Sequence, residues 1–202
     1  MKSRGCLIAG VIVGVIVLLA GGIVLWGTGI YNGLVKSEEG VRSAWSQVES
    51  QYQRRADLIP NLVATVKGYA QQEKDVFLGV AEARAKVGEM TVTKEVLEDQ
   101  AAFAKFQAAQ DQLSSALSRL LVVAENYPQI KSNENFMNLQ TQLEGTENRI
   151  TVERQRYNTT VQGFNTQIRT FPTNFIAGMF AFKEKAYFAA KQGAENAPEV
   201  KF

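Results

Sequence analysis

The chain has 202 residues, with 22 basic and 20 acidic side chains, one cysteine and no histidine. Only Lys2 and Arg4 precede Tyr31 and no acidic residue does, so residues 31–202 carry equal numbers of basic and acidic groups. This balance argues against a nucleic-acid-binding protein, which needs a net basic surface. The lack of histidine and the single Cys6 exclude a Ser-His-Asp or Cys-His relay, imidazole metal ligands, intramolecular disulfides and thiolate-bound zinc.

Residues 7–26 form an apolar run of twenty residues without a charge. As a helix this run spans roughly 30 Å, the thickness of the hydrocarbon core of a bilayer. The alternative is a cleaved signal peptide, whose apolar core is usually about 7–15 residues long. The run continues past the small residues at 20–22 to its end, so we favour an uncleaved anchor over residues 1–30. The predicted membrane-spanning residues include Leu7, Gly10, Gly14, Leu18, Gly22 and Trp26.

The charges that flank this run predict its orientation. Lys2 and Arg4 precede it, whereas Lys36 is the nearest basic residue after it and two glutamates follow. The positive-inside rule then places the N-terminus in the cytoplasm and the bulk of the chain outside a single-pass cell (inner) membrane. Gly10 and Gly14 form a GxxxG pair that would let two anchors pack closely, although such a match arises easily in a Gly-rich segment.

Beyond Tyr31, apolar residues recur in steps of three and four, which predicts long amphipathic helices. We expect an all-α fold in which the transmembrane helix continues into a long antiparallel bundle of three to four long helices. This bundle domain is assigned to residues 31–190, and residues 191–202 are predicted to be a loose polar tail. Three stripes carry the pattern: Leu34, Val41, Trp45, Val48, Tyr52, Ile59, Leu62, Val66, Tyr69, Phe77 and Val80; Val96, Phe103, Phe106, Leu113, Leu117, Leu120 and Ala124; Phe136, Leu139, Leu143, Ile150, Tyr157, Val161, Phe164 and Ile168.

Breaks between the helices are expected at proline- and glycine-containing segments. Pro60 removes a backbone donor inside the first stripe, so we predict a kink or short break there, with helices near 30–58 and 60–87. Residues 88–91 separate the first and second stripes. The helix that carries the second stripe is predicted to end before Pro128, and the helix that carries the third stripe is predicted to end near Thr170. A short aromatic helix is expected to follow, through Phe188.

Several segments resemble the LemA family. The resemblance covers residues 31–188 and rests above all on the run from Gln51 to Val63, QYQRRADLIPNLV. Weaker matches lie at 44–49, 83–85, 125–128, 139–150, 157–158 and 171–174. The resemblance implies an anchored bacterial-type protein with a long antiparallel helical bundle and no known enzymatic activity or catalytic residues. The family also looks related to a protein of magnetosome membranes implicated in membrane shaping.

Two polar clusters are candidates for function. The first surrounds Pro60 and could bind an anion or a partner, or could simply satisfy the helix near the proline. Its candidate interaction residues are Arg54, Arg55, Asp57, Pro60 and Asn61. The second lies on the last long helix, where Glu147 and Arg154 fall on or near the apolar stripe. We interpret them as ion pairs that set helix register or as a solvated face, and acid–base catalysis is the alternative.

The sequence favours a non-enzymatic scaffold or interaction protein of the cell envelope, with a lipid bilayer and either further copies or another protein as partners. An oligomeric array that shapes membranes is the first alternative. An enzyme that uses only carboxylate, Lys or Tyr groups is the second. We expect no cofactor, no metal and no small-molecule substrate. The aromatic segment 171–188, whose only charged residues are Lys183, Glu184 and Lys185, either touches the membrane interface or covers apolar residues of the bundle.

Overall fold

The computed structural model describes the backbone of residues 2–190 and the side chains of residues 10–190. Within this part of the chain every regular element is a helix, which confirms the predicted all-α class. The predicted loose tail, residues 191–202, lies outside the described residues. The elements in chain order are α1 (Lys2–Lys67), α2 (Lys74–Gly88), α3 (Lys94–Glu98), α4 (Gln100–Glu125), α5 (Pro128–Lys131), α6 (Glu134–Arg169) and α7 (Thr173–Met179).

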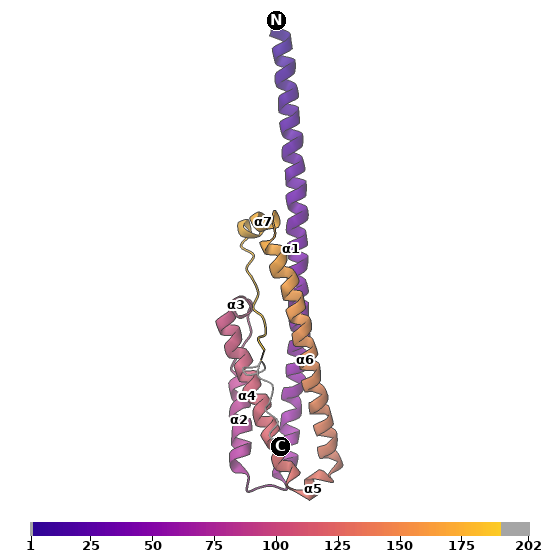
Figure 1. The fold of residues 1–202 in the computed structure, drawn as a ribbon, viewed down its shortest axis with the longest axis vertical. Helices are drawn as coiled ribbons and strands as arrows, with labels where there is room; N and C mark the ends of the chain where they lie inside the picture. Colours follow the sequence, from indigo (N-terminus) through magenta and orange to yellow (C-terminus); the bar gives the residue numbers. More distant parts are fainter. Residues whose placement is uncertain (1, 191–202) are drawn as a thin grey trace, which may run out of the picture.

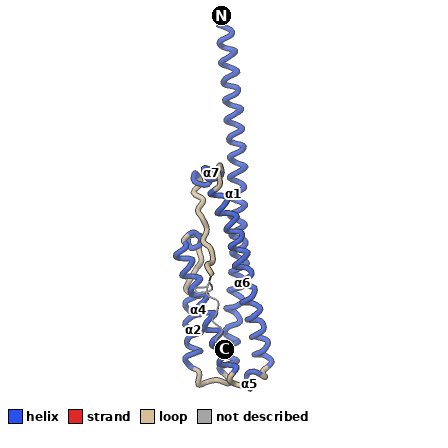
Figure 2. The backbone as a smooth tube through the Cα atoms, in the orientation of Figure 1, coloured by secondary structure: helices blue, strands red, loops and turns tan. Residues whose placement is uncertain are grey.

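Four of these helices form an antiparallel bundle, in which α1 packs mainly against α6 and α2 mainly against α4. The N-terminal part of α1 projects far beyond the bundle, as Figures 1 and 2 show. We call the bundle end from which α1 projects the proximal end, and the opposite end, near α5, the distal end. The predicted anchor helix therefore does continue directly into the bundle.

The prediction of a break at Pro60 was wrong. α1 continues through Pro60 to Lys67, and the chain turns only at residues 68–73. Pro60 is exposed, while Ile59 and Leu62 beside it are buried, so packing on the opposite face holds the helix together despite one missing backbone donor. The predicted helices near 30–58 and 60–87 are thus replaced by α1, whose 66 residues extend about 100 Å, and by the separate α2.

The other breaks lie close to their predicted places. α4 ends at Glu125, three residues before Pro128, the proline that begins α5. The second apolar stripe is divided by Asp99, whose carboxylate accepts hydrogen bonds from the backbone N–H groups of Ala101 and Ala102 and so begins α4. These bonds lower the pKa of the Asp99 carboxyl. Asn133 caps the start of α6 in the same way, through the N–H of Phe136.

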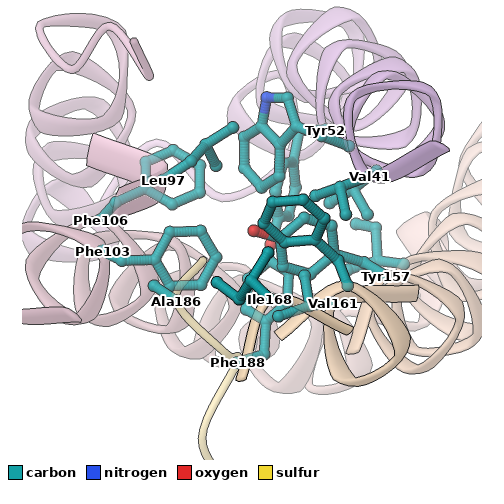
Figure 3. Close-up of a cluster of buried hydrophobic side chains, with 14 of the residues drawn as sticks. Val41, Tyr52, Leu97, Phe103, Phe106, Tyr157, Val161, Ile168, Ala186 and Phe188 are labelled. Atoms are coloured by element: carbon teal, nitrogen blue, oxygen red, sulfur yellow. The ribbon is translucent and has the colours of Figure 1, made fainter. Parts of the chain in front are cut away.

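The bundle encloses two groups of buried apolar side chains. The proximal group is rich in aromatic residues, and the Trp45 ring contacts the rings of Phe103, Phe106, Tyr157 and Phe188. Figure 3 labels the latter four. The distal group is mainly aliphatic and comes from α1, α2, α4, α5 and α6. α4 begins further from the proximal end of the bundle than the point at which α6 ends, so it leaves part of the proximal group uncovered. This part is completed by α3 and by residues 182–190.

The predicted aromatic helix through Phe188 was also partly wrong. Only α7 is helical, and it ends at Met179. Residues 182–190, which we call the C-terminal segment, have no helical structure and run back along the bundle towards its distal end (Figure 2). The turn into this segment passes through Ala181, which has a φ of 54°.

Candidate functional site

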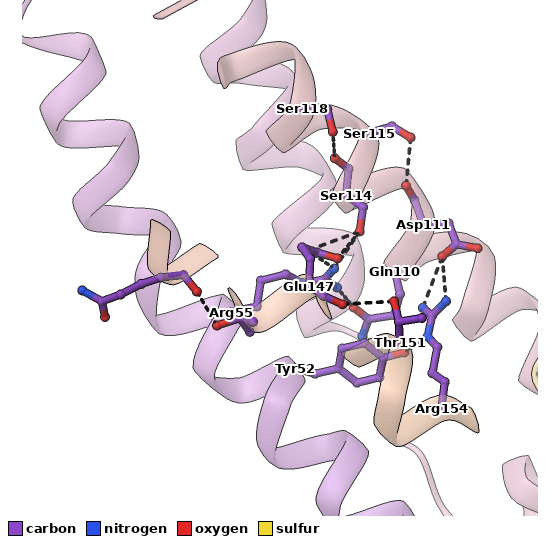
Figure 4. Close-up of polar contacts among 12 residues, drawn as sticks. Tyr52, Arg55, Gln110, Asp111, Ser114, Ser115, Ser118, Glu147, Thr151 and Arg154 are labelled. Atoms are coloured by element: carbon purple, nitrogen blue, oxygen red, sulfur yellow. Dashed lines mark hydrogen bonds and ion pairs between the residues drawn. The ribbon is translucent and has the colours of Figure 1, made fainter. Parts of the chain in front are cut away.

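A layer of polar side chains lies between the two apolar groups. We call it the polar layer; Figure 4 shows its members, Tyr52 and Arg55 of α1, Gln110, Asp111 and Ser114 of α4, and Glu147 and Arg154 of α6. It therefore joins three long helices at one level. Burial of such groups is costly unless they are paired, so the layer specifies how the helices are aligned.

Arg55 is the centre of this layer, with only 1% of its surface exposed. Its Nη1 donates to Glu147 Oε1 at 2.8 Å and to Ser114 Oγ at 2.7 Å, and its Nη2 donates to the side-chain oxygen of Gln110. The Nε of Arg55 is buried and has no hydrogen-bond partner among the described residues. Tyr52 lies beside the guanidinium, with its ring centroid 5.3 Å from Arg55 Cζ.

Arg154 forms the second half of the layer. Its Nε donates to the Tyr52 hydroxyl at 2.8 Å, and Nη1 and Nη2 lie 3.1 and 3.2 Å from Asp111 Oδ1. Burial opposes the charge of Arg154, but Tyr52 and Asp111 outweigh it and raise the pKa of the guanidinium. Burial raises the pKa of Tyr52. Glu147 and Arg154 thus both face the bundle interior in ion pairs, as the register interpretation predicted.

The structure separates the predicted interaction cluster around Pro60. Arg55 points inwards, whereas Arg54, Asp57, Pro60 and Asn61 are exposed. Asp57 accepts a hydrogen bond from Gln53 Nε2 at 2.8 Å, and both line a shallow surface hollow together with Arg54. The four exposed residues remain candidates for an interaction surface, and Arg55 belongs to the polar layer instead.

The apolar stripes contain a signal for the polar layer. The stripe of α1 jumps seven residues from Tyr52 to Ile59, and the stripe of α4 jumps seven from Phe106 to Leu113. Arg55 and Gln110 occupy these gaps, and Glu147 occupies a similar gap on α6. These gaps are only a weak signal, because the stripes also step by seven residues from Leu34 to Val41 and from Val96 to Phe103, and only the fold aligns the gaps of the three helices.

Side-chain amides hold the C-terminal segment by pairing with its backbone. Asn165 Nδ2 donates to the carbonyl oxygen of Lys185, and the Lys185 N–H donates back to Asn165 Oδ1, both at 2.9 Å. Asn158 binds both backbone groups of Phe188 in the same way. Two glutamines of α4 repeat this arrangement, Gln100 with Tyr187 and Gln107 with Ala189.

The amides are spaced seven residues apart on each helix, so they lie two turns apart on one face. α6 and α4 therefore form the two walls of a peptide groove, which the C-terminal segment of the same chain fills. The sequence did not point to this groove, because asparagine and glutamine are common on exposed helix faces.

Lys185 adds an ion-pair network at the proximal end of the groove. Its buried Nζ lies 2.6 Å from Glu38 Oε1 on α1 and 2.7 Å from Glu98 Oε1 on α3. Burial opposes the charge of Glu38, but the hydrogen bond and charge of Lys185, assisted by Lys94, outweigh it and lower the pKa of the Glu38 carboxyl. The C-terminal segment is thereby tied to the helix that continues into the anchor.

The projecting part of α1 is long and apolar enough to cross a membrane. The predicted membrane-spanning residues from Gly10 to Trp26 are all exposed, with no part of the bundle against them, whereas the side chain of Leu7 lies outside the described residues. α7 packs beside α1 where this bare part ends (Figure 1). An apolar helix surface of this length in water would be unfavourable, so a bilayer is its natural surrounding.

The sequence model of the LemA family matches residues 44–202, more than three-quarters of the chain. The chain belongs to the LemA family. It is similar over 182 residues to Magnetosome protein MamQ 1 of Paramagnetospirillum magneticum, with 29% identity, covering 82% of this chain and 67% of the relative. The corresponding MamQ of Magnetospirillum gryphiswaldense is 26% identical over the same shares. Protein LemA of Metamycoplasma hominis is 23% identical over 161 residues, 80% of this chain and 69% of the relative.

Membership of the LemA family confirms the resemblance predicted from the run between Gln51 and Val63. That run contains Tyr52 and Arg55 of the polar layer as well as the exposed Arg54, Asp57, Pro60 and Asn61. The family match begins within α1, so the apolar run of residues 7–26 precedes it and one uninterrupted helix joins the two parts of this LemA-family protein.

Proposed function

We propose that this protein is a non-enzymatic scaffold of the cell envelope, tethered to the membrane by residues 7–26, whose bundle binds a protein partner or further copies of itself. One observation carries the proposal: α1 passes without a break from the apolar run through the whole bundle. Any partner bound to the bundle would therefore be held at a defined height above the bilayer. By the positive-inside rule the bundle lies outside the cytoplasm.

The polar groups of the bundle support a structural rather than a catalytic role. The carboxylates of the polar layer are engaged by Arg55 and Arg154, and burial raises the pKa of Tyr52 and Tyr157 further from neutrality. A general acid or base works best with a pKa near the operating pH. Among residues 10–190, no three His, Cys, Asp or Glu side chains gather as a metal-binding group.

Co-purification tests the scaffold proposal. The full-length tagged protein is extracted from native membranes in mild detergent, and bound proteins are quantified against a control that carries only the anchor and the tag. We expect one or more proteins, or further copies of the chain, to be enriched with the full-length protein alone. A strict monomer without any reproducible partner contradicts the proposal.

Membrane shaping by an oligomeric array is the second candidate, and the similarity to magnetosome proteins favours it. The long α1 would act as a strut that transmits contacts between bundles to the bilayer. Reconstitution at high density into liposomes, imaged by electron cryo-microscopy, tests it. Tubulated or uniformly curved vesicles are expected, and unchanged vesicle shape contradicts this function.

A further inference from the structure

The anchor determines where the bilayer surface meets the bundle. Residues 7–26 fill the hydrocarbon core, and no charged residue follows until Lys36. The polar region of a bilayer adds roughly 5–7 Å on each side. At about 1.5 Å per residue, residues 27–31 of α1 lie within this region.

α7 lies beside α1 at this same level. A β-carbon placed on Gly27 would be 3.8 Å from Ile176 Cδ1 of α7. The ring centroid of Phe180, which follows α7, is 4.6 Å from that of Tyr31. Figure 1 shows α7 as the part of the bundle nearest to the bare stretch of α1. α7 is therefore held at the height of the bilayer surface.

The face of α7 that points away from the bundle is apolar and uncovered. Ala177 is buried and Ile176 half-buried against the bundle. In contrast, the exposed fractions are 74% for Phe171, 67% for Phe175, 74% for Met179 and 53% for Phe180. The rings of Phe171 and Phe175 contact each other edge to face, with centroids 5.9 Å apart. Met179 lies one helical turn after Phe175 on α7 and Phe180 follows it, so we group these four neighbouring exposed side chains as the α7 patch.

The charges around the α7 patch fit a lipid surface. Residues 170–182 contain no charged side chain, and Arg169 and Lys183 flank them. Both cations are largely exposed and form only long ion pairs, 3.8 Å from Glu184 and 4.0 Å from Glu98 respectively. Such cations at the rim of an apolar patch can reach lipid phosphates while the aromatic residues enter the acyl boundary.

The rest of the bundle surface has no comparable feature among the described residues. Elsewhere on the bundle the exposed large apolar side chains, such as Leu78, Val122 and Val152, are spread over α2, α4 and α6, and each of these three has charged residues within four positions in the chain. Single exposed residues of this kind are normal in soluble proteins, whereas a contiguous patch marks an interaction surface. The patch continues the apolar surface of the anchor, and this continuity identifies its partner as the bilayer.

We propose that the α7 patch is a second membrane contact, inserted into the interfacial layer of the leaflet from which α1 enters the bundle. This contact is additional to the membrane anchor. The proposal depends on the anchor, but it does not depend on whether the bundle acts as a scaffold. One helix alone leaves a bundle free to rotate and tilt at the membrane. Together, α1 and the α7 patch restrict both motions. The α7 patch also inserts its aromatic side chains into one leaflet only.

Fluorescence quenching by brominated lipids tests this contact in the full-length protein reconstituted into liposomes. The background variant is Trp26→Phe, in which the buried Trp45 gives a constant signal. Phe175→Trp and Met179→Trp report on the α7 patch, and Val122→Trp is the matched control, exposed on α4 away from the membrane. Circular dichroism verifies that each variant is folded. The test needs only one of the two α7 variants, so it can still be done if the other does not fold.

The expected result is a shorter emission wavelength and a loss of fluorescence for the α7 variants. This loss is expected to be larger when bromine lies near the glycerol end of the acyl chains than near their termini. The control should be quenched by acrylamide in the water and not by the lipid. Quenching of the α7 variants by acrylamide as strong as that of the control would overturn the proposal. Protection from both quenchers would also overturn it, because a second protein molecule would then cover the patch. Neither outcome depends on whether a partner co-purifies.

Discussion

Arg55 of α1 and Glu147 of α6 face each other across the bundle, with Arg55 Nη1 2.8 Å from Glu147 Oε1 although 92 residues separate them in the chain. They meet where the apolar stripes of α1, α4 and α6 are interrupted together. A shift of one helix by a single turn would leave the Arg55 cation against apolar side chains. The pair therefore specifies helix register more than it adds net stability.

Replacing Glu147 alone should be costly. Glu147→Leu leaves the buried guanidinium with only the neutral Ser114 and Gln110. Loss of one partner of a buried pair costs about 3–5 kcal/mol, and we expect the lower end because 35% of the Glu147 side chain is exposed. Urea unfolding in mild detergent, followed by circular dichroism, measures the change. The double variant Arg55→Met/Glu147→Leu is expected to recover most of the loss, and a double variant as unstable as Glu147→Leu would contradict this account.

The same substitution should affect the stability of the protein very differently at two neighbouring arginines. Arg55→Ala removes a buried side chain and its bonds, so the free energy of unfolding should fall by about 3 kcal/mol or more. Arg54→Ala changes an exposed side chain and should stay within about 0.5 kcal/mol of the parent. If the exposed cluster binds a partner, Arg54→Ala should instead reduce co-purification. Equal destabilisation by both variants would contradict the finding that the Arg55 side chain is buried and the Arg54 side chain is exposed.

Pro60→Ala should stabilise the protein. α1 is helical on both sides of Pro60, and the proline withholds one N–H from the helix on an exposed face. Proline inside a helix costs up to about 3 kcal/mol relative to alanine, so a gain of about 1–3 kcal/mol is expected in the same unfolding measurement. Asn61→Ala, at the next exposed position, is the control and should have little effect. A loss of stability in Pro60→Ala would indicate that the proline has a structural role here.

The C-terminal segment should loosen when its amide partners are removed. Asn165→Ala deletes both hydrogen bonds to the backbone of Lys185 and leaves its buried N–H and carbonyl unpaired. Such a loss costs about 1–3 kcal/mol, equivalent to a change of roughly fivefold to 150-fold in the opening equilibrium. Hydrogen exchange of the amides of residues 185–189 should accelerate accordingly. Gln155→Ala, exposed on the same helix, should leave these rates unchanged; no acceleration in Asn165→Ala would refute the pairing.

Acid should release the C-terminal segment through Glu38. Lys185 lowers the pKa of the Glu38 carboxyl in the folded protein below 4.5, the ordinary value of a glutamate side chain and the one expected in the unfolded chain. The pairing therefore contributes stability above about pH 4.5, and this contribution is lost as the pH falls through the folded pKa. Hydrogen exchange of residues 185–189 from about pH 7 to about pH 3, corrected for intrinsic rates, measures it. In Glu38→Gln the acceleration of this hydrogen exchange at low pH should disappear. If the acceleration persists, it arises from the protonation of other carboxylates.

Local patterns predicted the helices, the anchor and the family. The step of three and four residues is a property of a single helix, and a run of twenty apolar residues has the length of a bilayer in any fold. The ends of α4 and α6 were predictable as well, because proline and capping residues act on their immediate neighbours. The inward positions of Glu147 and Arg154 followed from the same stripe.

The sequence by itself therefore determined that the chain forms long helices, which of their faces are apolar and where the chain can cross a membrane, since these depend on neighbours a few residues away. Only the tertiary structure decided that α1 continues through Pro60, that Arg55 meets Glu147, and that residues 182–190 fill a groove instead of forming a helix. Each of these depends on groups from two or three helices at one level of the bundle. Packing supplies them from distant parts of the chain, and no local pattern records which distant residues will meet.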